Sequence, residues 1–204
     1  PATIHLEKTG NTLRAETSAL NLQISGSGIP SNAAIFAEPI AFSQTGNSTT
    51  LRSKGRIADV PLTWIDGVAN NAISRAGLTG SMAMRGNWDV ELGDAMRVHA
   101  VVERSQGDLN VAASELGGYG SVAAGIRTAR LEVNGTGGAL ESHLQWDSSN
   151  AGRANLQLNT RLTRTADGGW TLTNTAPLSG GLQANLPRMG IWSVFAPPGW
   201  RLRG

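Results

Sequence analysis

The sequence has 204 residues, of which 40% are hydrophobic and 16% charged, so it carries enough apolar side chains to fold around a core. Its formal net charge of +2, with basic and acidic residues interspersed, argues against a nucleic-acid partner. The absence of cysteine excludes disulfides and thiolate metal sites. The 26 glycines and 8 prolines favour short strands joined by turns, so we expect an all-β chain.

From the N-terminus, apolar and polar residues alternate with a period of two, as in strands with one covered and one solvated face. Ile4 and Leu6 precede turn residues at 9–11, and later strand patterns pause at 26–28 and 45–47. Each pause contains glycine with serine, threonine or asparagine, which suits tight turns. The first part of the chain is therefore predicted to be a series of hairpins.

Two segments break this alternation. Residues 61–77 begin with Pro61 and then place apolar residues at helical spacing up to Gly77, which predicts a short amphipathic helix. Residues 187–199 predict a second, shorter helical turn. Since both segments follow a strand pattern and contain a tryptophan, they form a weak internal repeat. The chain is predicted to be a single fragment, 1–204, of a longer elongated β-sheet protein, either undivided or built from modules 1–77 and 78–204.

The second half continues the alternation, interrupted by the glycine-rich residues 112–123, which are expected to form a long connection. The apolar members of these strands are the candidates for a binding surface. Ordinary core packing is the alternative at each position, because a trough wall and a packed core give the same alternation. They are Met82, Met84, Val90, Leu92, Val98, Val102, Leu131, Val133, Leu144, Leu156, Leu158, Leu162 and Leu172. Trp88, Trp146 and Trp170 share this side and are expected to line it, seal it or pack a helix.

Catalytic patterns are missing from the sequence. His5, His99 and His143 all fall on the polar side of predicted strands, and none has a second ligand at metal-binding spacing. Asp89 and Glu91 share a strand face, which is ordinary for a solvated surface and a weak sign of an acid and base pair. We therefore expect a protein that is not an enzyme and that has no metal and no cofactor.

The function depends on what covers the apolar side of the strands. Two sheets could pack as a sandwich, the sheet could close as a membrane barrel, or it could bend into an open trough. One tyrosine and three phenylalanines are too few for the aromatic girdles of a barrel. Many similar strands with few long crossovers favour the trough, whose apolar interior would exceed what a soluble monomer usually exposes. The predicted fold is all-β, a curved, mostly antiparallel sheet forming an elongated trough (β-taco) with a hydrophobic interior and one or two short helices. A self-contained β-sandwich, serving as a structural or adhesin module without a ligand, is the alternative.

Residues 107–204 also resemble a known family. The stretches LQWDSSNAGRANLQLNTRL, APLSGGLQANLP and WSVFAPPGWRLRG are similar to the C-terminal region of the TamB family, the inner-membrane subunits of the bacterial translocation and assembly module. PLTW and GLTGSMAMRGNWDVELGD resemble the preceding part of that region, whereas the first sixty residues match in pattern alone. These stretches belong to a scaffold and contain no catalytic signature.

The resemblance implies a periplasmic location, in a protein anchored in the inner membrane by a segment outside this chain. It also implies an elongated hydrophobic groove related to those of AsmA-like and bridge-like lipid-transfer proteins. The implied partners are phospholipid acyl chains, the outer-membrane barrel protein TamA, whose contact is expected outside this chain, and unfolded outer-membrane proteins as clients. The implied roles are phospholipid transport to the outer membrane, and assembly of its β-barrel proteins and autotransporters.

Overall fold

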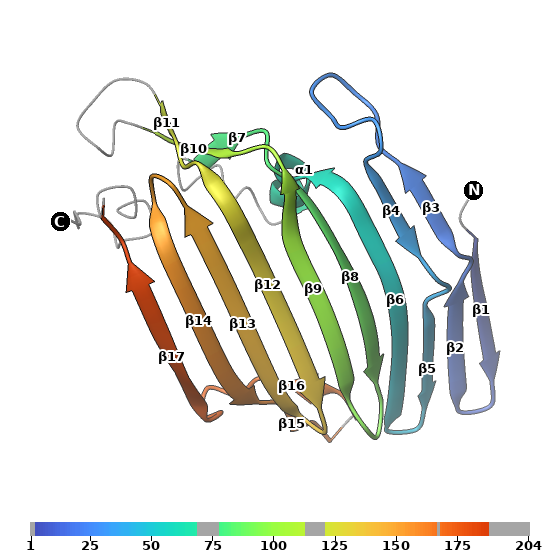
Figure 1. The fold of residues 1–204 in the computed structure, drawn as a ribbon. Helices are drawn as coiled ribbons and strands as arrows, with labels where there is room; N and C mark the ends of the chain where they lie inside the picture. Colours follow the sequence, from blue (N-terminus) through green and yellow to red (C-terminus); the bar gives the residue numbers. More distant parts are fainter. Residues whose placement is uncertain (1–2, 69–77, 113–120, 167, 188–204) are drawn as a thin grey trace.

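A computed structural model describes residues 3–68, 78–112, 121–166 and 168–187. The chain is almost entirely β-structure, and twelve strands form one antiparallel sheet (Figure 1). This sheet is curved and is not closed into a barrel, since β1 (Ile4–Thr9) and β17 (Leu178–Asn185) end its main path on opposite sides. The predicted all-β trough is therefore confirmed.

The main path of the sheet follows the order β1-β2-β5-β6-β8-β9-β12-β13-β14-β17, so its strands lie side by side in the order in which they occur in the chain. The edge pair β3 (Leu20–Gln23) and β4 (Ala34–Ala37) joins it through β6. The remaining strands of the path are β2 (Thr12–Thr17), β5 (Ala41–Thr45), β6 (Ser48–Pro61), β8 (Ala83–Leu92), β9 (Arg97–Gln106), β12 (Ile126–Thr136), β13 (Ala139–Ser148) and β14 (Gly152–Arg161). β6 pairs directly with β8, so one continuous sheet contains strands from both 1–77 and 78–204.

Tight turns lie where the alternation pauses. Gly10 and Gly46 have φ values of 58°, and they form the turns of the β1–β2 and β5–β6 hairpins. This left-handed conformation is one that glycine adopts without steric cost. Gly93 and Asp94 likewise lie between β8 and β9. The hairpins predicted with turns at 9–11 and 45–47 are confirmed.

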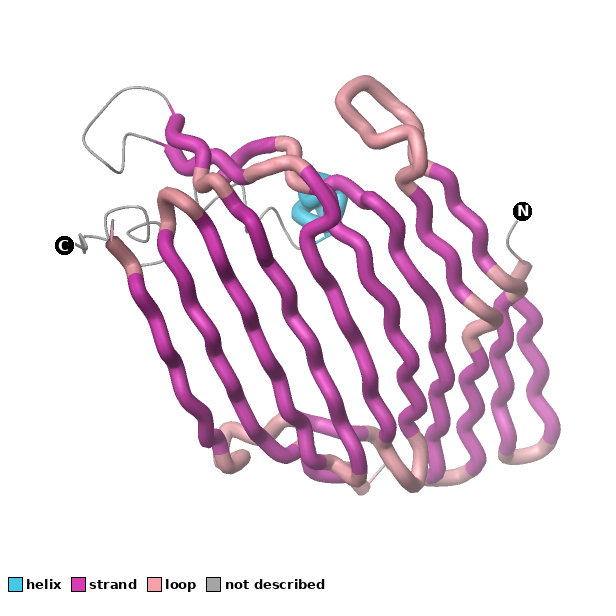
Figure 2. Tube along the Cα trace, in the orientation of Figure 1, coloured by secondary structure: helices cyan, strands magenta, loops and turns pink. Residues whose placement is uncertain are grey.

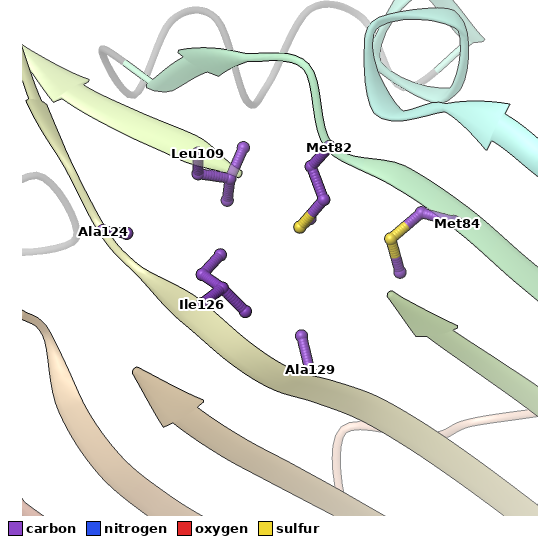
Figure 3. Close-up of a cluster of buried hydrophobic side chains, with 6 residues drawn as sticks. All are labelled: Met82, Met84, Leu109, Ala124, Ile126 and Ala129. Carbon is purple, nitrogen blue, oxygen red and sulfur yellow. The ribbon is translucent and has the colours of Figure 1, made fainter. Parts of the chain in front are cut away.

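One end of the sheet, the upper end in Figure 1, is covered by additional elements. These are α1 (Leu62–Val68), the one helix among the described residues (Figure 2), and a small sheet of β7 (Leu78–Gly80), β10 (Leu109–Ala112) and β11 (Ser121–Ala123). Their side chains enclose a compact core with the ends of β8 and β12, and Figure 3 shows these side chains pointing toward one another. We call this cluster the end core; it consists of Met82, Met84, Leu109, Ala124, Ile126 and Ala129.

The opposite end is crossed by a segment that leaves β14, forms the hairpin of β15 (Thr163–Arg164) and β16 (Trp170–Thr171), and returns to β17. In Figures 1 and 2 it passes behind the lower ends of the strands. Beside it, Met96 is completely buried, with its methyl group against Gly135. Both ends of the sheet are therefore covered.

Several predictions differ from the structure or fall partly outside it. The first predicted helix is described as α1 over Leu62–Val68, and residues 69–77 lie outside the described residues, as does the second predicted helix apart from its first residue. Residues 112–123 contain part of β10 and all of β11 on either side of 113–120, which lie outside the described residues. A sandwich needs a second large sheet, whereas the other strands in the described residues form sheets of three and two strands.

Candidate functional site

The strand register aligns apolar side chains in rows that cross the sheet at right angles to the strands. Residues directly opposite in antiparallel strands lie on the same face, so each row continues from strand to strand. We call the face that carries three such rows the apolar face. The first row is Ile57, Gly86, Val102, Leu131, Leu144, Leu156 and Leu182; the second is Gly55, Trp88, Ala100, Val133, Ser142, Leu158 and Gly180; the third is Ser53, Val90, Val98, Gly135, Leu140, Thr160 and Leu178.

The other side, the charged face, carries the intervening residues of the same strands, including all three histidines. Ion pairs cross from strand to strand on it. Glu103 accepts hydrogen bonds from Arg130 Nη1 and Arg85 Nε, both at 2.7 Å, and Glu91 accepts from Arg52 Nη2 at 2.9 Å and from Arg97. One face of the sheet therefore carries charged side chains that pair with one another, and the other face carries almost no charged side chains.

The middle of the apolar face is open, in contrast to its two ends. Leu131 exposes 43% of its surface and Leu182 65%, whereas Ile126 in the end core exposes 4%. The other large side chains in the first two rows are half-buried. Among the described residues, no second layer covers these rows. The structure thus presents an apolar surface bounded by covered ends, as a trough requires.

The predicted binding residues divide into three groups in the structure. Nine of them lie in the rows just defined or, for Leu92, in the adjoining pair with Leu51: Val90, Leu92, Val98, Val102, Leu131, Val133, Leu144, Leu156 and Leu158. Met82 and Met84 are instead packed in the end core, where little of their surface is available to a ligand. Leu162 follows the end of β14, and Leu172 follows β16, so neither belongs to the main ladder.

The structure adds residues to the rows that the predicted set lacks. Leu178 and Leu182 on β17 are exposed, and Ile57 and Leu140 complete rows on β6 and β13. A signal for the β17 pair was present, because Leu178, Gly180 and Leu182 keep the period of two once glycine is accepted as a member. Glycine, serine and threonine residues occupy further positions of the same face, and a pattern of apolar residues does not identify them.

Glycines on the apolar face leave room for large neighbours to lie flat. The ring of Trp88 covers Gly55, where a Cβ atom would overlap it, and its Nε1–H donates to Ser53 Oγ at 2.9 Å. A Cβ atom on Gly180 would lie 3.0 Å from Leu158 Cδ2. Because these side chains lie along the sheet, they smooth the apolar face and do not project far from it.

The other two tryptophans have sealing roles. Trp146 packs against the end core, and Trp170 Nε1 donates to Gly93 O at 3.1 Å beneath the lower ends of the strands. Trp88 alone of the three lies in one of the three rows, and whether it lines a binding groove stays a prediction.

A hollow of about 590 Å³ lies on the charged face, over the lower ends of β2, β5, β6 and β8. Its charged lining includes Arg52, Glu91 and Arg97, which are already paired with one another. Since Asp94 is also paired, with Arg164, four of the six charged side chains of the lining already have partners, and the hollow is a weaker candidate for a ligand site than the apolar rows.

The ion pairs of the charged face predict a pH-dependent stability. Hydrogen bonds from Arg130 and then Arg85 hold the pKa of Glu103 below its ordinary value of 4.5. A carboxylate with a lowered pKa in the folded state stabilises the fold above its unfolded pKa, and this contribution is lost as the pH falls through the folded pKa. We expect wild type to be more stable than Glu103→Gln at pH 7, and the difference to disappear below pH 4.5 toward pH 2 in urea titrations. Glu16→Gln, on β2 outside this network, is the control; an equal pH response in both variants would contradict the assignment.

The described residues hold neither a metal-binding cluster nor a membrane-spanning helix. They contain no group of three or more histidine, aspartate or glutamate side chains arranged to hold a metal ion. None of their helical structure has the length and hydropathy needed to cross a bilayer. Comparisons with protein families, with curated proteins and with solved structures found no match for this chain.

Proposed function

We propose that this chain is a non-enzymatic scaffold of the TamB type, which holds phospholipid acyl chains along its apolar face during transport between the inner and outer membranes. The observation that carries the proposal is the open middle of this face, where Leu131 and Leu182 expose 43% and 65% of their surfaces between covered ends. Large exposed apolar areas usually mark a binding surface. Localisation in the periplasm and cooperation with TamA rest on the sequence resemblance.

The length of the rows suits an acyl chain. The first row crosses seven strands, and with strands about 4.8 Å apart its six intervals span roughly 29 Å. A bilayer core about 30 Å thick holds two acyl chains end to end, so each is about 15 Å long. One row is therefore long enough for two chains in sequence, lying across the strands.

The free energy of transfer is also sufficient. Removing a methylene from water gains about 0.8 kcal/mol, so a dozen methylenes gain on the order of 10 kcal/mol before the cost of ordering the chain. The head group would remain in water, because the apolar rows contain few hydrogen-bonding side chains. Apolar contact of this kind depends little on the structure of the acyl chain or on head-group chemistry, which suits a carrier of many lipids.

A second function, assistance in assembling outer-membrane β-barrels, is supported by the edge strand β17. All eight of its residues are exposed and none is charged, whereas β1 at the other edge carries His5, Glu7 and Lys8. Uncharged edge strands invite pairing with an incoming strand, and charged ones discourage it. An unfolded barrel protein could therefore dock at β17.

Site-specific photo-crosslinking separates these functions. A crosslinker at Leu158 in the second row should capture lipid in cells, and purified protein should release acyl lipid on extraction. The matched control is Gln157, the preceding residue on the same strand, whose amide donates to Glu141 on the charged face at 2.9 Å. Protein adducts from Leu158 without copurified lipid would favour barrel assembly. If neither lipid nor protein adducts were obtained, both functions would be contradicted.

A further inference from the structure

The connection between β14 and β17 is far longer than its ends require. These strands are antiparallel neighbours, which a turn of about two to five residues would join. The chain instead places sixteen residues, 162–177, between Arg161 and Leu178. We call the described residues of this connection, 162–166 and 168–177, the strap.

The strap contacts three separate turns at the lower end of the sheet. Near its start, the N–H of Leu162 donates to Gly138 O at 2.7 Å, at the β12–β13 turn. At the β8–β9 turn, Arg164 Nη2 donates to Asp94 Oδ1 at 2.5 Å and Trp170 Nε1 donates to Gly93 O. The strap thus reaches across the sheet to residues some seventy positions away in the chain.

Its farthest contact is with the β5–β6 turn. Asn47 Nδ2 donates to Ala166 O at 3.3 Å, across 119 positions of sequence. Buried Gly168, with φ of 80°, lies against the backbone of Asn47 and Thr49, where a Cβ atom would collide. The strap therefore links β14 directly to the start of β6, although five strand interfaces separate these strands within the sheet.

We propose that the strap is a tie that fixes the curvature of the sheet and so sets the width of the trough. A single-layer sheet bends at each strand interface, where the angle between neighbours varies over tens of degrees. Five such interfaces in series leave the distance between β6 and β14 weakly determined by backbone pairing alone. A direct link across them removes this freedom, and release of the Arg164–Asp94 and Trp170–Gly93 contacts would let the trough widen.

Spin-label distances test the tie without any lipid. The chain has no cysteine, so Thr50→Cys on β6 and Arg161→Cys on β14 can be labelled specifically, with both labels on the charged face. In this background we compare the intact strap, Asp94→Asn, Trp170→Phe, and replacement of 162–177 by an Asn-Gly turn. We expect replacement to broaden the distance distribution and lengthen its mean by roughly one strand spacing, about 4.8 Å, with smaller shifts for the single substitutions. High salt should broaden the distribution of the intact strap and leave Asp94→Asn unchanged, because ionic screening weakens exposed ion pairs.

The matched control is Glu38→Gln, which removes the exposed ion pair between Glu38 and Lys54. Unlike the contacts of the strap, this pair does not connect distant strands of the sheet. It should leave the distance unchanged. If the strap replacement fails to fold, the single substitutions still decide, since circular dichroism can verify their folding. An unaltered distribution in Asp94→Asn and Trp170→Phe would overturn the tie. Because the measurement uses lipid-free protein, that outcome is distinguishable from failure of the lipid-carrier function.

Discussion

Replacement of Ile126 by alanine is expected to lower the free energy of unfolding by about 2–4 kcal/mol. Ile126 lies in the end core and exposes 4% of its surface, in contact with a cluster contributed by β8, β10 and the start of β12. Truncation leaves a cavity that α1 and the small sheet cannot fill without moving. Urea titration, with linear extrapolation to water, measures the change.

The control for this prediction is Ile4→Ala, the same chemical change at a residue of β1 that exposes 70% of its surface. A surface change of this kind should stay within about 0.5 kcal/mol. The lipid content per folded molecule should be the same in both variants, since neither residue lies in the open middle of the apolar face. Equal destabilisation at the two positions would mean that the end core does not hold the sheet together.

The faces of the strands could be predicted because alternation is a local property. Leu156 and Leu158 on one side, and Asn155 and Gln157 on the other, are distributed in the structure as the period of two requires. Which strands adjoin could also be anticipated, since tight turns join most neighbours. The amphipathic character and overall class of the fold therefore follow from short stretches of sequence.

The ends of the trough could not be predicted, because they depend on long-range packing. Met82 and Met84 have the same alternation as Val90, and only the position of α1 and the small sheet makes them core residues. Trp170 has the pattern of a strand, but its place is set by a hydrogen bond to Gly93, 77 positions away. The period of two identifies which face of each strand is apolar, but it does not identify what packs against that face. Residues of the end core therefore could not be distinguished from residues of the open surface.

Replacement of Leu131 by glutamate is expected to reduce copurified lipid at least about tenfold, which corresponds to about 1.4 kcal/mol of binding free energy. Leu131 lies between Val102 and Leu144 in the first row and is 43% exposed. The carboxylate of a glutamate introduced there would therefore remain solvated in the lipid-free protein. Acyl chains would displace that water, and desolvating an unpaired carboxylate costs several kcal/mol. Lipid extraction followed by mass spectrometry measures the loss.

The matched control is Asn155→Glu, which adds the same charge at an exposed position of β14 on the charged face. It should leave the lipid content unchanged, because the new carboxylate stays in water whether or not lipid is bound. Both variants should retain the circular dichroism of the wild type, since neither residue belongs to the end core. Equal lipid loss in the two variants would point to an effect of net charge, and undiminished lipid in Leu131→Glu would mean that acyl chains do not occupy the apolar face.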